Sequence, residues 1–482
     1  MARFGWRTGA VVVVVALAVL IGMMVLSSSH RDPKIKADPT ESTKVTDLQF
    51  AVWGAKAEIE AYQGVVDDYN ASSSDTRVTV KAWPDAAAML ADIRSGDERP
   101  DLYMLPRSEL AETIKAKRNR PLLDLLDERK IPIGDDFERN AVAAFSTDDD
   151  LQCMPYISAP TVMYYNTKLI DFDKMAEADL PTPSRRHTAW NLAEFRAAAE
   201  FASRPRRKTR GVYIEPSLKG LAPFIYSGGG HLFNEDQDPT SLALADDDSA
   251  DSLRKTLEIL RDPRLTLTSK QLAKKPAIDW FKQGRLGMIA GTRQLTPQLR
   301  ETKGLNFDVM PMPSLGTPAT LGDLTGVCLM AGRPARVESS ANFLTYLISD
   351  EAVARVSATG YVQPAKQTVS LGPDFQQVGQ MPEHSAVFTN SIRSMVLPPL
   401  IGDGSTLVKL IDPEVKALFT RPTLPDLDAA LEAIDEKSRT LLTGDDAPEP
   451  SDDASSEAPS PSGSPSGGPS TKPSATEGRS GG

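Results

Sequence analysis

Hydrophobic positions along residues 48–105 alternate between the spacing of strands and the spacing of helices. Residues 48–53, 77–83 and 101–105 are short runs typical of strands. The first two runs are separated by apolar residues at helical spacing, and these are Ile59, Tyr62, Val66 and Tyr69. Met89, Leu90 and Ile93 form a second helix face ahead of the third run. Repeated strand and helix units of this kind predict an α/β fold.

The segment 280–291, WFKQGRLGMIAG, predicts a helix end, a turn and a buried strand in quick succession. Gly284 can adopt the left-handed conformation that ends a helix. Residues 286–290 have the length and composition of a buried strand, and Gly291, Thr292 and Arg293 place polar groups where that strand ends. Strand ends are a common ligand position in open α/β sheets. This segment therefore supplies a first candidate for a binding site.

The last predicted element is a helix with Leu427, Leu431, Ile434 and Leu441 on one face, and Gly444 ends it. Residues 445–482 are almost entirely Ser, Pro, Gly, Ala and acidic residues, a composition that predicts a disordered tail. Seven acidic residues against Lys472 and Arg479 give this tail a charge of −5, nearly half of the formal net charge of −11. An acidic chain of this kind is not expected to bind nucleic acid.

The amino terminus has the pattern of an export signal. Arg3 and Arg7 precede residues 10–26, which are 17 apolar or small residues. This length is at the short edge of the roughly 17–25 residues that span a bilayer, so the segment fits either a cleaved signal peptide or an uncleaved anchor. Lipid attachment is not expected, because neither of the two cysteines, Cys153 and Cys328, follows the apolar run.

Several longer motifs occur in one order along the chain. They are SGDERPDLYML at 95–105, MPYISAPTVMYYNTKLI at 154–170, TAWNLAEF at 188–195, SGGGHLFNED at 227–236, FDVMPMP at 307–313 and ANFLTYLISDEAVARVSATGYVQPAK at 341–366. Together with segment 280–291, they resemble the family 1 extracellular solute-binding proteins, which are maltose-binding-protein-like receptors of ATP-driven importers. The resemblance extends from about Leu48 to Gly444.

The resemblance implies an α/β fold of the type II periplasmic-binding-protein kind, with two discontinuous lobes joined by crossing strands and closing over a ligand by hinge motion. The crossings are expected near 156–160 and 323–327. The expected parts of the chain are a signal peptide or signal anchor at 1–29, a linker at 30–46, lobe 1 at 47–156 and 327–362, lobe 2 at 157–326 and 363–444, and the tail at 445–482.

The resemblance also implies ligand positions, although several places where relatives carry aromatic rings differ here. Arg293, Ser217 and Leu105 occupy three such places, and aromatic residues make up only 6% of the chain. The expected ligand-binding residues are Trp53, Lys56, Arg107, Ser108, Tyr156, Glu215, Trp280, Arg293 and Asp323, with Arg293 as the leading candidate. The alternative for Lys56 and Arg107 is a surface charge, and for Trp280 a place in the core.

The expected function is that of an extracytoplasmic receptor that captures a small solute, with carbohydrate as the family expectation, and presents it to importer permease subunits. One alternative is a receptor for a polar or anionic non-sugar solute. Another is a membrane-anchored scaffold or sensor subunit with a degenerate cleft. The protein is expected to act as a monomer at the outer face of the cytoplasmic membrane, anchored by its amino-terminal segment or secreted.

An enzyme is not expected, and neither is a cofactor or a metal site. The sequence has four histidines but no GxSxG, HExxH or CxxC motif. Glu215 and Asp323 could imitate the carboxylate pair of a glycosidase. The same acids would serve equally well as acceptors for sugar hydroxyl groups in a receptor.

The resemblance implies that Cys153 and Cys328 lie close together, because the strands that carry them run side by side at the base of the hinge. Export would expose both thiols to an oxidising compartment, where a disulfide can form. The alternative is two buried, reduced cysteines that pack as small apolar residues.

Overall fold

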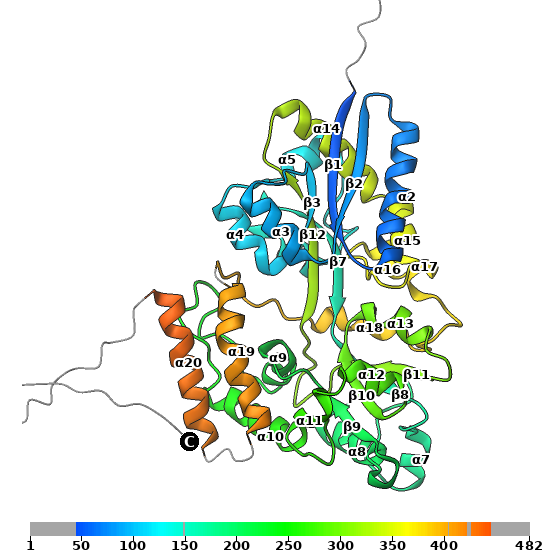
Figure 1. The fold of residues 1–482 in the computed structure, drawn as a ribbon, viewed down its shortest axis with the longest axis vertical. Helices are drawn as coiled ribbons and strands as arrows, with labels where there is room; N and C mark the ends of the chain where they lie inside the picture. Colours follow the sequence, from blue (N-terminus) through cyan, green and yellow to red (C-terminus); the bar gives the residue numbers. More distant parts are fainter. Residues whose placement is uncertain (1–44, 148–149, 403, 422–425, 445–482) are drawn as a thin grey trace, which may run out of the picture.

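Two β-sheets organise the chain, each in its own lobe (Figure 1). The computed structural model describes residues 45–147, 150–402, 404–421 and 426–444. The expected signal segment, nearly all of the expected linker and the acidic tail lie outside these residues. None of the described helices combines the length and the apolar character needed to cross a bilayer.

The first sheet has the strand order β2-β1-β3-β12-β4, and β7 also pairs with β12. Its strands are β1 (Thr46–Trp53), β2 (Thr76–Trp83), β3 (Leu102–Pro106), β4 (Asn119–Arg120), β7 (Met154–Pro160) and β12 (Gly322–Met330). β1 is parallel to both β2 and β3, whereas β12 is antiparallel to β3, β4 and β7. The three strands predicted near the amino terminus are confirmed as β1, β2 and β3.

The second sheet has the order β11-β8-β10-β9. Its strands are β8 (Val162–Asn166), β9 (Arg210–Tyr213), β10 (Leu286–Gly291) and β11 (Phe307–Met310). β10 is the strand predicted from the WFKQGRLGMIAG segment, and Gly284 before it has the expected left-handed conformation, with φ 64°. A two-stranded hairpin of β5 (Ser146–Thr147) and β6 (Asp150–Leu151) completes the strands of the described residues.

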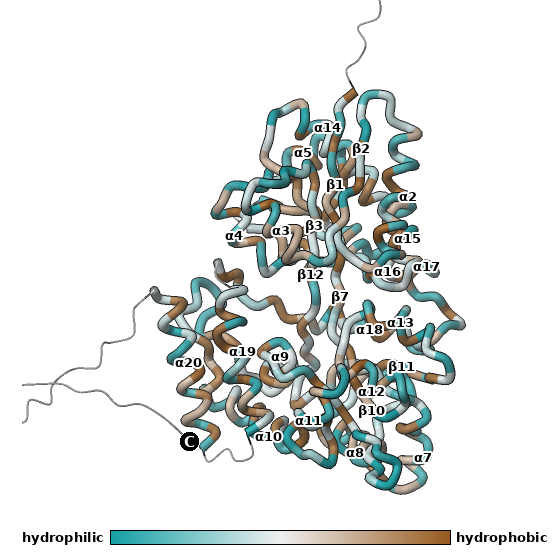
Figure 2. Tube along the Cα trace, in the orientation of Figure 1, coloured by the Kyte–Doolittle hydropathy of each residue, from teal (hydrophilic) through white to brown (hydrophobic). Residues whose placement is uncertain are grey.

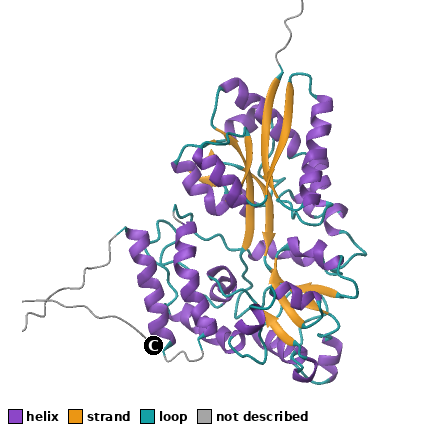
Figure 3. Ribbon diagram, viewed as in Figure 1, coloured by secondary structure: helices purple, strands orange, loops and turns teal. Residues whose placement is uncertain are grey.

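Helices flank both sheets (Figure 3). The helices around the first sheet are α2 (Lys56–Ser72), α3 (Ala86–Ser95), α4 (Leu110–Lys115), α5 (Leu123–Glu128), α6 (Arg139–Ala144), α14 (Pro334–Leu347), α15 (Asp350–Ser357) and α16 (Gln367–Ser370). Those of the second lobe are α7 (Phe172–Glu177), α8 (Leu192–Ala202), α9 (Leu218–Ser227), α10 (Asp247–Leu260), α11 (Ser269–Leu272), α12 (Ala277–Lys282), α13 (Thr296–Arg300), α17 (Pro373–Gln376), α18 (Ala386–Ser391), α19 (Gly404–Thr420) and α20 (Leu427–Thr443). Short 3-10 turns are η1 (Arg107–Glu109), η2 (Pro205–Arg207), η3 (Arg293–Leu295) and η4 (Ile392–Ser394).

The second sheet is covered on both faces. Along β8, Met163 and Tyr165 join one hydrophobic cluster, while Val162 and Tyr164 join another. Alternate residues of a strand point to opposite faces, so the continuous apolar run of this strand has a partner layer on each side. α19 and α20 add to the first of these clusters, and both alternate between hydrophobic and hydrophilic residues along their length (Figure 2).

The hydrophobic core of the first lobe is discontinuous in sequence. It contains residues from Leu48 to Ala159 and again from Leu324 to Met395. The change of core therefore falls between Ala159 and Val162 and between Leu321 and Leu324, within a few residues of the two expected crossings.

The segment 363–444, expected in lobe 2, is divided between the two lobes. Val369, Ile392 and Met395 pack into the core of the first lobe, whereas Phe375 and Phe388 belong to the second. The chain returns to the first lobe at η4, where Ile392 and Met395 enter its core, and Met395 also forms a parallel bridge with Thr320, next to the second crossing. This return adds a further connection between the lobes.

A disulfide joins Cys153 and Cys328, with a Cα–Cα separation of 4.3 Å. Cys153 immediately precedes β7, and Cys328 lies within β12, in a stretch where Val327 pairs with Met154. Both side chains are fully buried in the first lobe. The bond thus fastens the first-lobe ends of the two crossing strands and leaves their other ends free to bend.

Replacing both cysteines by alanine should lower the free energy of unfolding by about 2–5 kcal/mol, because the bond closes a long loop in the unfolded chain. Urea unfolding of the wild type and the double variant measures the difference, and a reductant should destabilise only the wild type. Thiol labelling of the denatured, unreduced wild type should detect no free thiol. Two labelled thiols would contradict the disulfide.

Candidate ligand-binding cleft

A cleft of about 540 Å³ is lined by residues of both lobes. Trp53, Arg107 and Ser108 come from the first lobe, and Lys219 and Phe233 from the second. The other lining residues are Ala86, Pro106, Leu218, Leu232, Gln294, Leu321, Gly322, Asp323, Leu324, Thr325, Val396, Pro398, Pro399, Leu400, Ile401, Gly404, Leu407 and Val408. Because the walls belong to different lobes, hinge motion can close this cleft around a ligand.

The direction of β1 and β3 brings the first-lobe residues of the cleft wall together. β1 and β3 are parallel neighbours, so their carboxyl ends meet at one edge of the sheet. Trp53 is the last residue of β1, and Arg107 and Ser108 follow directly after β3. Residues more than 50 positions apart in sequence are thereby brought to the same side of the cleft.

Arg107 is half-buried, and only one of the nitrogen atoms of its guanidinium group donates a hydrogen bond within the described residues. Its Nε donates to the carbonyl oxygen of Ala144 at 3.2 Å. Within the described part of the chain, its two Nη atoms have no hydrogen-bond or ion-pair partner. Burial lowers the pKa of Arg107 to about 10, which leaves the group protonated at neutral pH. Both Nη atoms are therefore available to a ligand.

Asp323 and Lys219 form an ion pair in the cleft. Asp323 belongs to β12 and Lys219 to the first turn of α9, and about half of each side chain is exposed. Ion pairs this exposed typically contribute about 0–1 kcal/mol. A ligand that offers hydroxyl groups or charge can compete for either partner at little cost.

The rest of the cleft is largely apolar. Trp53 and Phe233 contribute rings, and the segment 396–401 contributes a wall with two adjacent prolines, Pro398 and Pro399. The backbone N–H of Val396 donates to the carbonyl oxygen of Thr320 at 2.9 Å, which attaches this wall to the second crossing. The cleft thus combines apolar surfaces with a small number of polar groups, as small-molecule sites usually do.

Residues 64–383 match the sequence profile of a family described as bacterial extracellular solute-binding protein. The chain belongs to this family. The description places the protein among exported binding proteins, in agreement with the export signal expected from the sequence. No curated protein matches the chain by sequence.

Solved structures of solute-binding proteins share the fold. The ABC substrate-binding protein Lmo0181 from Listeria monocytogenes, in complex with cycloalternan, has a TM-score of 0.71 and 17% identity over 83% of this chain and 100% of its own. The sugar-binding protein MalE from Xanthomonas citri has a TM-score of 0.70 and 15% identity over 83% and 98%. The GacH receptor of Streptomyces glaucescens, solved unliganded and with acarbose, has a TM-score of 0.66 and 18% identity over 83% and 99%. The expected two-lobed α/β fold is confirmed.

Arg293, the leading candidate from the sequence, does not lie in the cleft of this solute-binding protein. Its side chain is fully buried. Its Nη2 donates to the carbonyl oxygen of Phe375 at 3.0 Å, and its Nε to that of Gly360 at 3.3 Å. The guanidinium also lies over the rings of Phe375 and Phe388, at 4.8 and 5.2 Å from their centroids. The prediction is wrong because η3 begins one residue after the strand, so that Gln294 lines the cleft while the Arg293 side chain is directed into the protein interior.

Four other expected ligand residues also lie away from the cleft lining. Tyr156 is 2% exposed, and its ring packs 6.0 Å from that of Tyr62 in the first-lobe core. Trp280 is 8% exposed and packs in the second lobe, as its core alternative proposed. Lys56 and Glu215 are exposed, and Lys56 pairs with Glu60 at 3.5 Å. Of the nine expected residues, the cleft brings together Trp53, Arg107, Ser108 and Asp323.

Sequence reasoning missed Lys219, Gln294, Phe233 and the apolar segment 396–401. The motif EPSLKG at 215–220 held a usable signal. Ser217, where an aromatic ligand residue was expected, instead caps α9 by accepting from the N–H of Gly220 at 3.2 Å. A cap at Ser217 places Lys219 in the first turn of the helix, which is the end that faces the cleft.

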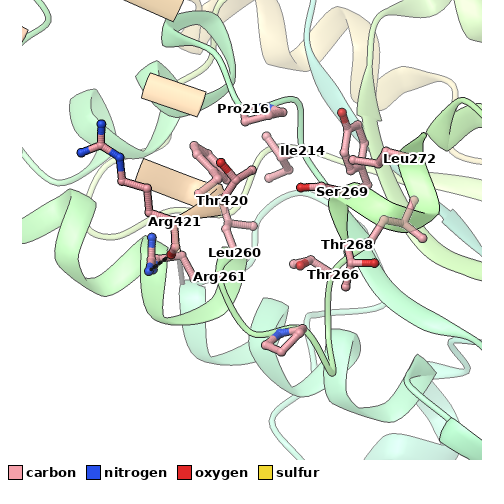
Figure 4. A pocket seen from close by; sticks show the side chains of 14 residues that line it. Ile214, Pro216, Leu260, Arg261, Thr266, Thr268, Ser269, Leu272, Thr420 and Arg421 are labelled. Carbon is pink, nitrogen blue, oxygen red and sulfur yellow. Dashed lines mark hydrogen bonds between the residues drawn. The ribbon is translucent and has the colours of Figure 1, made fainter. Parts of the chain in front are cut away.

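A second cavity, of about 290 Å³, is formed by residues of the second lobe alone (Figure 4). Its lining includes Ile214, Thr268 and Thr420, and the guanidinium of Arg261 at its edge donates to the carbonyl oxygen of Arg421 at 2.8 Å. Lobe closure cannot enclose a ligand here, because no residue of the first lobe takes part.

Arg293→Ala should destabilise the protein by about 3 kcal/mol, because it leaves two buried carbonyl oxygens without a donor and removes a large buried side chain. The exposed Arg285, eight positions earlier, provides the matched control, and Arg285→Ala should change stability by less than about 0.5 kcal/mol. Urea unfolding at neutral pH measures both. Equal stability of the two variants would contradict the buried role of Arg293.

Proposed function

We propose that this solute-binding protein captures a carbohydrate in the cleft between its lobes and delivers it unchanged to an ATP-driven importer. The observation that carries the proposal is the composition of the cleft. Aromatic rings from both lobes, Trp53 and Phe233, lie among side chains that can bond to hydroxyl groups.

Carbohydrate fits this composition for a physical reason. The C–H face of a sugar ring is apolar and packs on a flat aromatic ring, while its hydroxyl groups need donors and acceptors. Asp323 supplies an acceptor, Arg107 and Lys219 supply donors, and Ser108 and Gln294 supply both. The structural neighbours agree in class, since their descriptions mention cycloalternan, acarbose and maltose.

An anionic or phosphorylated solute is the second candidate. The free Nη atoms of Arg107 support it, because guanidinium groups bind carboxylates and phosphates in a bidentate geometry. Lys219, across the cleft in the second lobe, would add a second positive charge once a ligand displaced Asp323 from it.

We further propose that the receptor acts as a monomer with importer permease subunits at the outer face of the cytoplasmic membrane. The apolar residues 10–26 support membrane delivery, either as an anchor that stays or as a signal that is removed. No catalytic step is needed for this function.

Ligand binding can be tested by thermal unfolding with a panel of sugars, polyols, phosphosugars and amino acids. A cognate sugar at 100 times its Kd should stabilise the protein by about 2.7 kcal/mol. Trp53→Ala should weaken its binding at least tenfold, about 1.4 kcal/mol, because the ring loses its apolar contact with the sugar. Arg285→Ala, outside the cleft, should leave the affinity unchanged.

Two results would contradict the carbohydrate proposal. Stabilisation by anionic compounds alone, abolished by Arg107→Ala, would favour the anionic candidate. An absence of any shift across the whole panel would favour a scaffold or sensor with a degenerate cleft.

A further inference from the structure

Three potential metal ligands that are far apart in sequence meet in the second lobe. His187 lies in the loop between α7 and α8, Asp308 belongs to β11, and His384 lies between α17 and α18. Their ligand atoms all lie within 4.8 Å of one another. None of the three lines the ligand cleft.

The three side chains are largely removed from solvent. Those of His187 and Asp308 are 8% and 7% exposed, and that of His384 is 32% exposed. The two imidazole rings stack, with centroids 3.8 Å apart and planes inclined by 30°. Two imidazoles and one carboxylate held together in this way are a donor set that suits Zn²⁺ and neighbouring divalent transition metals.

The carboxylate of Asp308 is held in place by the backbone. Its Oδ1 accepts from the N–H groups of Val309 and His384, at 2.9 and 3.0 Å. Its Oδ2 faces the rings, 2.6 Å from Nδ1 of His384 and 3.7 Å from Nδ1 of His187. One oxygen therefore positions the group, and the other is directed at both histidines.

These distances are near those of a metal site. Zn²⁺ bonds to nitrogen and oxygen are about 2.0–2.2 Å long, so tetrahedral ligand atoms lie roughly 3.3 Å apart. The 3.7 Å separation is close to this value, and Nδ1 of His187 would exchange its 3.3 Å contact with the carbonyl oxygen of Val309 for the metal. The 2.6 Å separation is that of a hydrogen bond, which would open by less than about 1 Å when a metal replaces the shared proton.

The cluster also has an entry path and a potential further ligand. A cavity of about 230 Å³ is lined by His187 and His384 together with the exposed Glu383. A metal bound by the three residues would face this cavity, where water or Glu383 could complete a tetrahedral site.

We propose that His187, Asp308 and His384 bind one divalent transition-metal ion, with Zn²⁺ as the best-fitting candidate, at a structural site separate from the solute cleft. Such an ion would link the long loop after α7 and the segment before α18 to the edge strand β11. The histidine spacing could not reveal the site, because the two rings are 197 positions apart in sequence.

Calorimetric titration with zinc chloride tests the proposal, using protein purified without a polyhistidine tag and stripped of metal by a chelator. One Zn²⁺ ion should bind per chain. His187→Gln and His384→Gln should each weaken binding at least tenfold. His231→Gln, at an exposed histidine of the same lobe, should leave binding unchanged.

Asp308→Asn separates the metal role from the backbone role. The amide oxygen can still accept from the two N–H groups, whereas the amide nitrogen cannot bind a metal. We expect the metal-free variant to unfold near the wild-type temperature and to bind Zn²⁺ at least tenfold more weakly. Zinc binding that survives all three substitutions, or no binding by the wild type, would overturn the proposal.

A measurement on the wild type avoids dependence on the folding of any variant. Modification of histidines by diethyl pyrocarbonate, mapped by mass spectrometry, should fall at His384 when Zn²⁺ is added and should not change at His231. Equal modification of His384 with and without Zn²⁺ would count against the site.

Discussion

The antiparallel pairing of β7 with β12 is the constraint on which the two-lobed structure depends. β7 begins in the core of the first lobe and leads into the second, whereas β12 runs in the opposite direction and ends in the first-lobe core (Figure 1). Gly322 is required at the far end of this pair, because an added Cβ would lie 2.7 Å from the carbonyl oxygen of Ala159. The disulfide closes the near end. The two hinge strands are thus covalently joined at their first-lobe ends. Toward the second lobe, backbone hydrogen bonds hold them together.

The cleft is a consequence of this arrangement. β12 carries Asp323 into the space between the lobes, while the ends of β1 and β3 present Trp53 and Arg107 from one side. The second lobe supplies Lys219 from the first turn of α9. Each wall rests on a rigid element, so lobe closure can bring the walls together without rebuilding either of them.

In the second lobe, the buried side chains of Arg293 and Asp308 bind backbone groups of distant segments. Arg293 joins the turn after β10 to the carbonyl oxygens of Gly360 and Phe375, and Asp308 joins β11 to the backbone of His384. These interactions connect the second sheet to Phe375 and His384, which lie in the stretch of chain between Val369 and Ile392 of the first-lobe core. Buried polar contacts, together with Phe375 and Phe388 in the core, therefore attach the stretch between Val369 and Ile392 to the second lobe.

The sequence by itself determined the elements and their order. Apolar runs and their spacing located β1, β2, β3 and the stripe of α2, because burial of one face imposes a period that depends only on local geometry. The length and apolar composition of residues 286–290 located β10. The ordered motifs indicated the family, and with it crossings expected near 156–160 and 323–327.

Only the tertiary structure decided which polar side chains share a site. The 3-10 turn η3 after β10 decides whether Arg293 or its neighbour Gln294 faces the cleft. Apolar periodicity carries no information about the direction of side chains in such a turn. The meeting of His187, Asp308 and His384 likewise depends on how distant segments pack against the edge of a sheet. Local spacing encodes the faces of helices and strands, whereas the convergence of distant side chains is set by long-range packing, which has no local signature.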